Sequence, residues 1–417
     1  MFPRGLRSVL CGVLCGAAAA GAQPATQSGA SPALSAFVRE TLTQNPGVQA
    51  AEAAVRAGGA REQAAAQPLY NPELEVGTEE TDVRETAVGL SQSLDWSDKR
   101  EARTAVAGAE RNAVAAALAR TRQEVATELL LALSAYQTAA DLEALSKRRL
   151  SLMQRFRDLA TRRQRAGDIS RIDLDLARLT AAQARLQRAR IAAERAAAEQ
   201  AMAAVAGELR ATWPSLPKEL PPISQKTSDD ALEALLMRVP QVQMARFQIA
   251  AARATVGLRA RERRPDPTVG FRVGREDSET LAGLSVSLPL FVRNTFRAEV
   301  DVANAELIRA ERQAQDIYRR AKARLLSAAQ RYQLTHAAWE DWQQSGQASL
   351  ESQLDLIERS WQAGELSTPD YLIQLNQALD TRAEALRLRG QYWEAWFDWL
   401  GASGRIDEWL GLADPAR

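Results

Sequence analysis

The chain has 417 residues, and its 46% hydrophobic and 25% charged content is normal for folded protein, so length and composition exclude little. Its 53 basic and 52 acidic residues give a formal net charge of +1. This balance excludes a strongly basic nucleic-acid-binding class, so we expect no nucleic acid as a partner.

The first 22 residues have the pattern of a secretory signal peptide. Arg4 and Arg7 precede an apolar run that ends in Ala-Gly-Ala, which predicts cleavage directly after that run. The two cysteines, Cys11 and Cys15, lie inside the run, and each follows a leucine where a lipoprotein signal has a small residue. We therefore expect the mature chain to carry no thiol, no disulfide and no lipid anchor.

The next stretch changes from a helical to a strand pattern. Residues 34–67 are rich in alanine, and Asn45-Pro46 interrupts them, so we expect two helices or one kinked helix. In residues 72–96, apolar and polar residues alternate in two segments separated by a polar turn near Thr81 and Asp82. This alternation predicts a strand hairpin with one apolar face.

Two long helical patterns follow the predicted hairpin. Residues 98–166 contain almost no helix breaker, and a second pattern covers about 171–209. A continuous helix over the first range would be about 100 Å long, which predicts that the two helices pack as a coiled coil along their length. Residues 213–227 are rich in proline and lack periodicity, so we interpret them as a linker or surface segment.

The second half of the chain repeats the first. Pro46 matches Pro240 at an offset of 194 residues, and further matches indicate a first repeat over 23–212 and a second over 228–400. The second repeat is expected to hold a strand hairpin at about 267–290 and long helices at about 295–363 and 368–400, followed by a C-terminal segment over 401–417. Five aromatic residues near the end are interpreted as a packing patch: Trp393, Trp396, Phe397, Trp399 and Trp409.

Each repeat has the same short stretch between its two long helices. Its glycine suits the left-handed position just past a helix end, and its serine, followed three residues later by aspartate, is a helix N-terminal cap. The stretch is therefore predicted to form the tip of a helical hairpin. The tip residues are Ala166, Gly167, Asp168, Ser170 and Asp173 in the first repeat, and Ala363, Gly364, Glu365, Ser367 and Asp370 in the second.

The four predicted strands bear on whether the chain spans a membrane. They cover residues 73–81, 85–94, 268–275 and 280–288, and about ten tilted residues cross a bilayer. No later apolar run reaches the ~20 residues of a membrane helix. Four strands cannot close a barrel, so a spanning chain would have to close its sheet with other copies of itself. The competing interpretation is a non-membrane periplasmic coiled-coil scaffold with a small sheet.

The duplicated layout, the tips and the strand segments resemble the TolC-type outer-membrane efflux factors over essentially the whole mature chain. Residues 263–268 (Arg-Arg-Pro-Asp-Pro-Thr) and 288–294 (Leu-Pro-Leu-Phe-Val-Arg-Asn) are similar to the cobalt-zinc-cadmium, CzcC-like branch, as are 71–75 and 88–92. The resemblance implies a mainly α fold with a small β part. It further implies a homotrimer in which four strands per chain form a twelve-stranded transmembrane β-barrel and the helical hairpins form an α-barrel tunnel. The linker over 213–227 and the C-terminal segment over 401–417 would lie in an equatorial belt around this tunnel.

The resemblance also implies a location and partners. The trimer would lie in the outer membrane of a Gram-negative bacterium and extend into the periplasm. There the two hairpin tips would contact a periplasmic adaptor, which couples the channel to an inner-membrane proton-driven pump. The expected role is a passive exit duct for divalent heavy-metal cations, with multidrug efflux or type I secretion as alternatives.

A periplasmic gate near the tips is the last implication, and this chain keeps only part of its pattern. Asp173 and Asp370 occupy the positions of the family's first gate aspartates. Trp361 replaces a tyrosine, Leu366 an arginine and Ile373 a second aspartate, so any acidic ring would be thinner. Helix capping alone is the alternative explanation for both aspartates, because an acid in the first helical turn is stabilising wherever it lies.

No sequence pattern indicates an enzyme, a cofactor or a resident metal. His336 is the only histidine, and transition metals normally need several His or Cys ligands. The sequence also lacks a nucleophile cluster and a Gly-rich phosphate loop. We therefore expect a conduit without catalytic residues, cofactor-binding residues or metal ligands.

Overall fold

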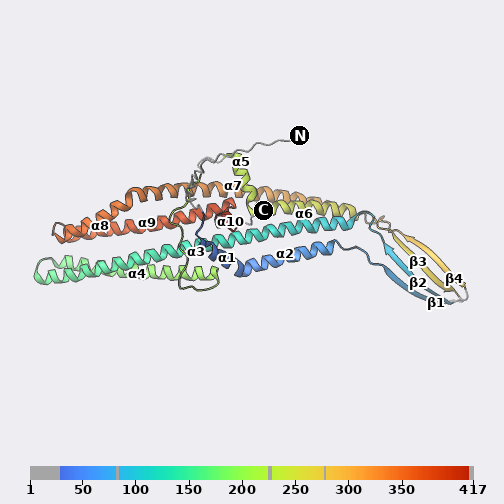
Figure 1. The fold of residues 1–417 in the computed structure, drawn as a ribbon, viewed down its shortest axis with the longest axis horizontal. Helices are drawn as coiled ribbons and strands as arrows, with labels where there is room; N and C mark the ends of the chain where they lie inside the picture. The colour runs from blue at the N-terminus through green and yellow to red at the C-terminus, as the bar shows by residue number, and fades with distance from the viewer. Residues whose placement is uncertain (1–28, 81–83, 224–227, 277–278, 413–417) are drawn as a thin grey trace, which may run out of the picture.

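The computed structural model describes residues 29–80, 84–223, 228–276 and 279–412. The predicted signal peptide and the turn near Thr81 and Asp82 lie outside these ranges. The described chain forms a long rod, with a β-sheet at one end and two helical hairpin tips at the other (Figure 1). The helices at residues 32–44 and 406–409, from the two ends of the chain, lie near the middle of the rod, and we call this region the waist.

The helices follow the same order in both repeats, as the sequence predicts. Asn45 separates the first two helices, since its side chain caps the second by accepting from the Gly47 and Val48 amides at 2.9 and 3.1 Å. The helices of the first repeat are α1 (Pro32–Gln44), α2 (Pro46–Ala65), α3 (Lys99–Ala166) and α4 (Arg171–Ala206). Those of the second are α5 (Asp229–Arg238), α6 (Pro240–Glu262), α7 (Arg297–Asp341), α8 (Gln347–Gln362) and α9 (Thr368–Ser403), and α10 (Ile406–Trp409) follows.

The four strands form one antiparallel sheet in the order β1 (Glu73–Glu80), β2 (Arg84–Ser93), β3 (Thr268–Glu276) and β4 (Glu279–Ser287). The sheet therefore joins the two repeats through the β2–β3 pairing, and β1 and β4 each pair on one side only. With the two long hairpins, this confirms the predicted class, mainly α with a small β part in two tandem repeats.

The register of the sheet places its apolar residues on one face. Leu90 lies opposite Leu74 on one side and opposite Phe271 on the other, and Phe271 in turn lies opposite Leu284. Directly paired residues share a face, so these four form a continuous apolar row across the sheet. All four side chains are exposed in the single chain. The other face carries mainly small and polar residues, together with charged ones and a leucine. They include Gly89, Ser91, Gly270, Gly274, Gly283 and Ser285, with Glu75, Glu85, Arg272 and Leu281.

A buried ion pair joins this sheet to the helices. The ammonium of Lys99, at the start of α3, lies 2.9 Å from Asp266 Oδ2, just before β3, and the two side chains are only 9% and 5% exposed. Lys99 Nζ also donates to the Arg264 carbonyl at 2.6 Å, and the Tyr70 hydroxyl donates to Asp266 Oδ2 at 2.7 Å. Burial and this hydrogen bond raise the pKa of Tyr70 to about 12. The phenol therefore stays a donor to Asp266 at physiological pH.

The main hydrophobic core lies at the waist, where the segments outside the long hairpins gather. The C-terminal aromatic cluster is buried there, with Trp396 and Trp399 stacked at 5.0 Å between ring centroids and Trp409 edge-on to Trp396 at 6.3 Å. This confirms its interpretation as a packing patch.

The stretch after α4 runs between the two repeats, and it also packs into the core at the waist. Leu216 and Leu220 are buried in the waist core, and Trp393 Nε1 donates to the Pro217 carbonyl at 3.0 Å. Because this segment is irregular, neither helical nor strand periodicity marks its buried residues. Its proline-rich chain wraps the core and holds the two repeats together.

The predicted helix over 295–363 is a continuous helical path but not one α-helix. A π-helical turn over Trp342–Gly346 separates α7 from α8, and turns of this kind deform a helix axis. Gly346 makes room for the Trp342 ring, since a Cβ at that position would overlap it. Figure 1 shows the path bending between α7 and α8.

Candidate functional site

The first hairpin tip is built from a helix end and a helix start only a few residues apart. α3 ends at Ala166, and Gly167 adopts a left-handed backbone with φ of 83°. The Gly167 amide donates to the Gln164 carbonyl at 3.1 Å, and the Asp168 amide to the Arg163 carbonyl at 2.9 Å. These bonds satisfy the last carbonyls of α3, which explains why glycine stands here.

Asp173 closes the other side of this tip as part of a reciprocal cap. Ser170 Oγ accepts from the Asp173 amide at 3.1 Å, and Asp173 Oδ2 accepts from the Ser170 amide at 3.1 Å and from its hydroxyl at 2.7 Å. The predicted capping box is confirmed. The carboxylate is therefore fixed in place by its own helix start.

A Ser170→Ala variant is expected to loosen the first turn of α4. Losing a serine cap costs about 1 kcal/mol, which corresponds to roughly fivefold faster hydrogen exchange at the Asp173 amide. Hydrogen exchange measured by mass spectrometry on peptides that cover the tip would check this. Ser151→Ala, at an exposed position inside α3, is the matched control. Equal exchange in the two variants would show that the cap does not hold this turn.

The second tip has the same left-handed glycine and serine cap as the first. Gly364 has φ of 80°, and the Glu365 amide donates to the Ser360 carbonyl at 2.9 Å. Ser367 Oγ accepts from the Asp370 amide at 3.3 Å and donates to Asp370 Oδ2 at 2.6 Å. Both tips lie at the same end of the rod (Figure 1).

The two tips place their candidate residues differently from one another. Asp168 and Glu365 are exposed in the turns, as is the Asp370 side chain, whereas Asp173 is half-buried. Among the described residues, no hydrogen bond or ion pair joins Asp173 to Asp370. In a single chain the aspartates are thus on separate hairpins.

Trp361 is a packing residue beneath the tips. Its ring stacks on Tyr371 at 4.4 Å between centroids and lies 5.5 Å from Phe156 of the first repeat. The Tyr371 hydroxyl donates to Glu358 at 3.0 Å, and burial raises the pKa of that phenol. The Arg163 guanidinium lies over the Trp361 ring at 5.5 Å. This aromatic cluster ties the two hairpins together near the candidate gate.

Sequence reasoning missed Phe156 and Tyr371 as partners of Trp361. Each lies at an apolar position of its own helix, so the spacing predicts only that it is buried in the core. Only the packing of α3 on α9 brings the rings together.

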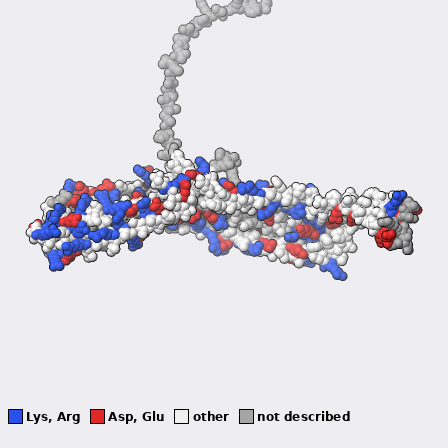
Figure 2. All heavy atoms as spheres, turned by 90° about the horizontal axis from the view of Figure 1, so that it is seen from below, with Lys and Arg blue, Asp and Glu red and all other residues white. Residues whose placement is uncertain are grey.

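The tip halves of the two hairpins carry opposite charge. Residues 147–190 contain 13 basic and 4 acidic residues, whereas the matching range 344–387 contains 3 basic and 7 acidic ones. Figure 2 shows the basic side chains gathered at the tip end of the molecule on the face that it displays. The near-neutral chain thus has a basic first hairpin and an acidic second hairpin.

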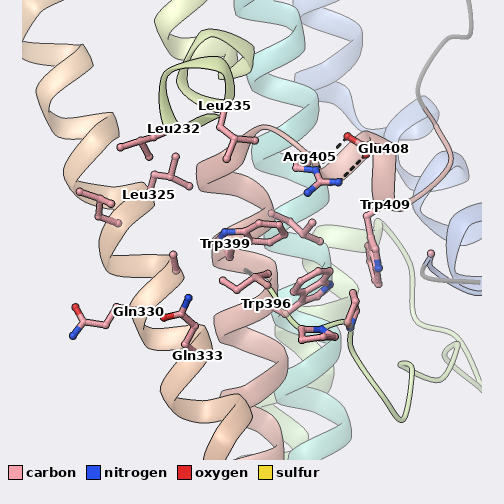
Figure 3. A pocket seen from close by; sticks show the side chains of 17 residues that line it. Leu232, Leu235, Leu325, Gln330, Gln333, Trp396, Trp399, Arg405, Glu408 and Trp409 are labelled. Carbon is pink, nitrogen blue, oxygen red and sulfur yellow. Dashed lines mark hydrogen bonds and ion pairs between the residues drawn. The ribbon is translucent and has the colours of Figure 1, made fainter. Parts of the chain in front are cut away.

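One cavity lies at the waist, away from the tips. It has a volume of about 680 Å³ and is lined by Leu232, Leu325, Trp396 and Trp399 among others (Figure 3). At its rim the Arg405 guanidinium lies 5.6 Å from the Trp399 ring centroid and 2.8 Å from Glu408 Oε1. These charged groups are engaged with each other, and the lining of the cavity is polar and apolar in similar measure.

His336 lies in an aromatic setting at the waist. Its ring is 5.7 Å from Tyr332 and 5.6 Å from Tyr392, and its Nδ1 lies 3.5 Å from Glu340. The described residues contain no group of three or more His, Cys, Asp or Glu side chains placed to hold a metal ion. Among the described helices, none combines the length and hydropathy of a membrane span.

Comparisons with known proteins point to one family. The family described as outer membrane efflux protein matches residues 37–208 and 231–403, which is one match in each repeat. The cobalt-zinc-cadmium resistance protein CzcC of Cupriavidus metallidurans is 24% identical over 336 residues, covering 79% of this chain and 80% of that protein.

Solved structures share the fold at low sequence identity. The CmeC outer membrane channel of Campylobacter jejuni superposes with a TM-score of 0.74 at 14% identity, over 92% of this chain and 90% of that one. The open-state MtrE outer membrane channel of Neisseria gonorrhoeae gives 0.72 at 18% identity, over 91% and 90%.

Proposed function

Because this chain belongs to the outer membrane efflux protein family, we propose that it is the outer-membrane channel of a pump–adaptor–channel efflux system in a Gram-negative bacterium. Three copies would form the channel, which serves as a passive exit duct. A periplasmic adaptor would bind the hairpin tips, and an inner-membrane proton-driven pump would supply the cargo. The solved structures that share its fold include outer membrane channels, which supports a conduit rather than an enzyme.

The observation that carries this proposal is the four-stranded sheet. One face of the sheet carries a continuous row of apolar side chains, and the other carries mainly small and polar ones. The two outer strands, β1 and β4, are each unpaired on one side. An apolar face of strands of this length suits lipid, and the small polar face suits a water-filled lumen. An open edge cannot face lipid, so strands from other copies must pair with β1 and β4.

Divalent heavy-metal cations are the cargo that we propose. The support is the match to CzcC, whose name records cobalt, zinc and cadmium resistance, together with its coverage of about four-fifths of both chains. The fold alone does not indicate which cargo passes, because several different outer membrane channels share it. Multidrug efflux and type I secretion are the alternatives within the same architecture.

Deletion of the gene for this chain is expected to lower the minimum inhibitory concentrations of zinc, cobalt and cadmium while leaving those of common antibiotics unchanged. The physical reason is that the pump has no other exit through the outer membrane. Growth assays with a complemented strain as control would measure this. Increased susceptibility to antibiotics with unchanged metal tolerance would instead assign the chain to drug efflux.

A periplasmic coiled-coil scaffold is the competing function, and fractionation separates the two. The channel is expected in outer-membrane fractions as a trimer that needs detergent for extraction. Recovery as a monomer from the periplasmic extract without detergent would contradict the channel. The unprotected apolar row on the sheet favours the first result, since a soluble monomer would expose it to water.

A further inference from the structure

One helix at the tip end carries an unusual repeated pair of residues. Arg171-Ile172, Arg178-Leu179 and Arg185-Leu186 recur at intervals of seven residues along α4. The three aliphatic side chains are 80%, 67% and 74% exposed. Residues seven apart lie on one face of a helix, so they form a stripe, which we call the α4 stripe, with an arginine beside each member.

The α4 stripe points away from the rest of its own chain. The opposite face of α4 is buried against α3 through Leu174, Ala177, Ala181 and Ala184. α3 then packs on α9, and α9 packs on α7 and α8. The helices thus form a row in the order α4, α3, α9 and α7–α8, with α4 at one edge. Exposed aliphatic residues at heptad spacing on an edge helix require a partner helix.

The other edge of the row has matching features. On α8, the Leu356 side chain is 53% exposed, and Ser352 and Ser349, one and two turns away respectively, are small and exposed. Glu351 and Asp355 are exposed on the same helix. This edge thus offers apolar and small surface flanked by negative charge, whereas the α4 stripe offers aliphatic surface flanked by positive charge.

Residues on the two edges also lie at similar distances from their hairpin tips, measured along the helix axis. Leu179 lies nine residues beyond the cap at Ser170, and Leu356 lies eight residues before Gly364, so both are about 12–14 Å from their tip at 1.5 Å per residue. Arg185 and Glu351 lie about 20–22 Å from theirs by the same measure. Neither of these two side chains forms an ion pair with a described residue.

We propose that the α4 stripe of one protomer packs antiparallel against α8 of a second copy, with Leu179 beside Leu356 and Arg185 opposite Glu351. Such an edge-to-edge contact is heterologous, and repeating it closes a ring. The inference rests on the proposed trimeric channel and assigns the residues that seal its tunnel near the periplasmic mouth. It also accounts for the opposite charges of the two hairpins, which become neighbours between subunits.

Disulfide trapping tests this contact directly. The only cysteines of the sequence are Cys11 and Cys15, inside the predicted leader, so an engineered pair faces no background in the mature chain. Oxidation of the L179C/L356C variant in outer membranes is expected to give covalent dimers and trimers on non-reducing gels. Each single variant should stay monomeric, because a heterologous contact keeps like residues apart. Failure of the pair to cross-link in a protein that remains trimeric and supports growth would overturn the inference and leave the channel intact.

A second experiment tests the stripe by its effect on assembly. L186E places a carboxylate in the stripe beside Glu351 of the neighbour, so trimers are expected to dissociate at a lower temperature on semi-native gels. The control S151E adds the same single negative charge at an exposed position of α3, outside the stripe. Trimers of L186E that are as heat-resistant as those of S151E, with only adaptor capture lost, would assign the stripe to the adaptor and refute this contact.

Discussion

An Asp266→Ala variant is expected to lose about 3–5 kcal/mol of stability, because it leaves the buried ammonium of Lys99 without its counter-ion. Asp266 is only 5% exposed, so no water can readily replace the carboxylate. The substitution also removes the acceptor of the Tyr70 hydroxyl. Lys99 Nζ would keep the Arg264 carbonyl as a hydrogen-bond acceptor, and the Asp95 carboxylate would act on its charge only without direct ion-pair contact. The contact between the start of α3 and the residues before β3 is therefore expected to be lost first on unfolding.

Urea unfolding of the purified protein in detergent, followed by tryptophan fluorescence, would measure the loss. The control is Glu194→Ala, which breaks the exposed Arg190–Glu194 pair and should cost less than about 1 kcal/mol. A double variant, Lys99→Met with Asp266→Leu, should recover most of the lost stability, because no unpaired charge remains buried. Equal midpoints for Asp266→Ala and Glu194→Ala would show that the ion pair does not stabilise that contact.

The hairpin tips could be predicted from sequence because their geometry depends on neighbours in the chain. Gly167 and Ser170 act within a few residues of the helix ends that they cap, and both caps form as expected. Lys99 and Asp266, by contrast, are 167 residues apart. They meet only because β2 pairs with β3, and neither strand hairpin specifies that pairing alone. Long-range contacts of this kind need the assembled sheet.

Other positions could not be predicted because periodicity does not show which of their side chains are buried. Leu216 and Leu220 sit in an irregular segment, where no periodicity separates buried from exposed positions. The α4 stripe was visible as heptad spacing, but the same spacing also describes the inner face of a coiled coil. Only the exposed fractions of its residues show that it faces outward.

Removing charge from the tips is expected to change ion selection by the channel. In the proposed trimer, three copies of Asp173 and three of Asp370 surround one opening. A carboxylate about 4 Å from a cation is worth about 1 kcal/mol even in water, so replacing both aspartates by alanine should lower cation over anion preference by about fivefold or more. Single-channel recording in planar bilayers with a salt gradient would measure this shift, together with the expected rise in conductance.

Both aspartates also cap helices, so the experiment must separate charge from capping. Asp173→Asn with Asp370→Asn removes the charge and leaves a side-chain oxygen that can accept the same hydrogen bonds. Ser170→Ala with Ser367→Ala weakens both caps and leaves the charge. If the aspartates form a gate, the Asn pair reproduces the Ala phenotype and the serine pair keeps cation preference. A shift produced by the serine pair alone would mean that Asp173 and Asp370 only fix the tips. Trp361 and its aromatic cluster would then be the part of the mouth that holds the hairpins closed.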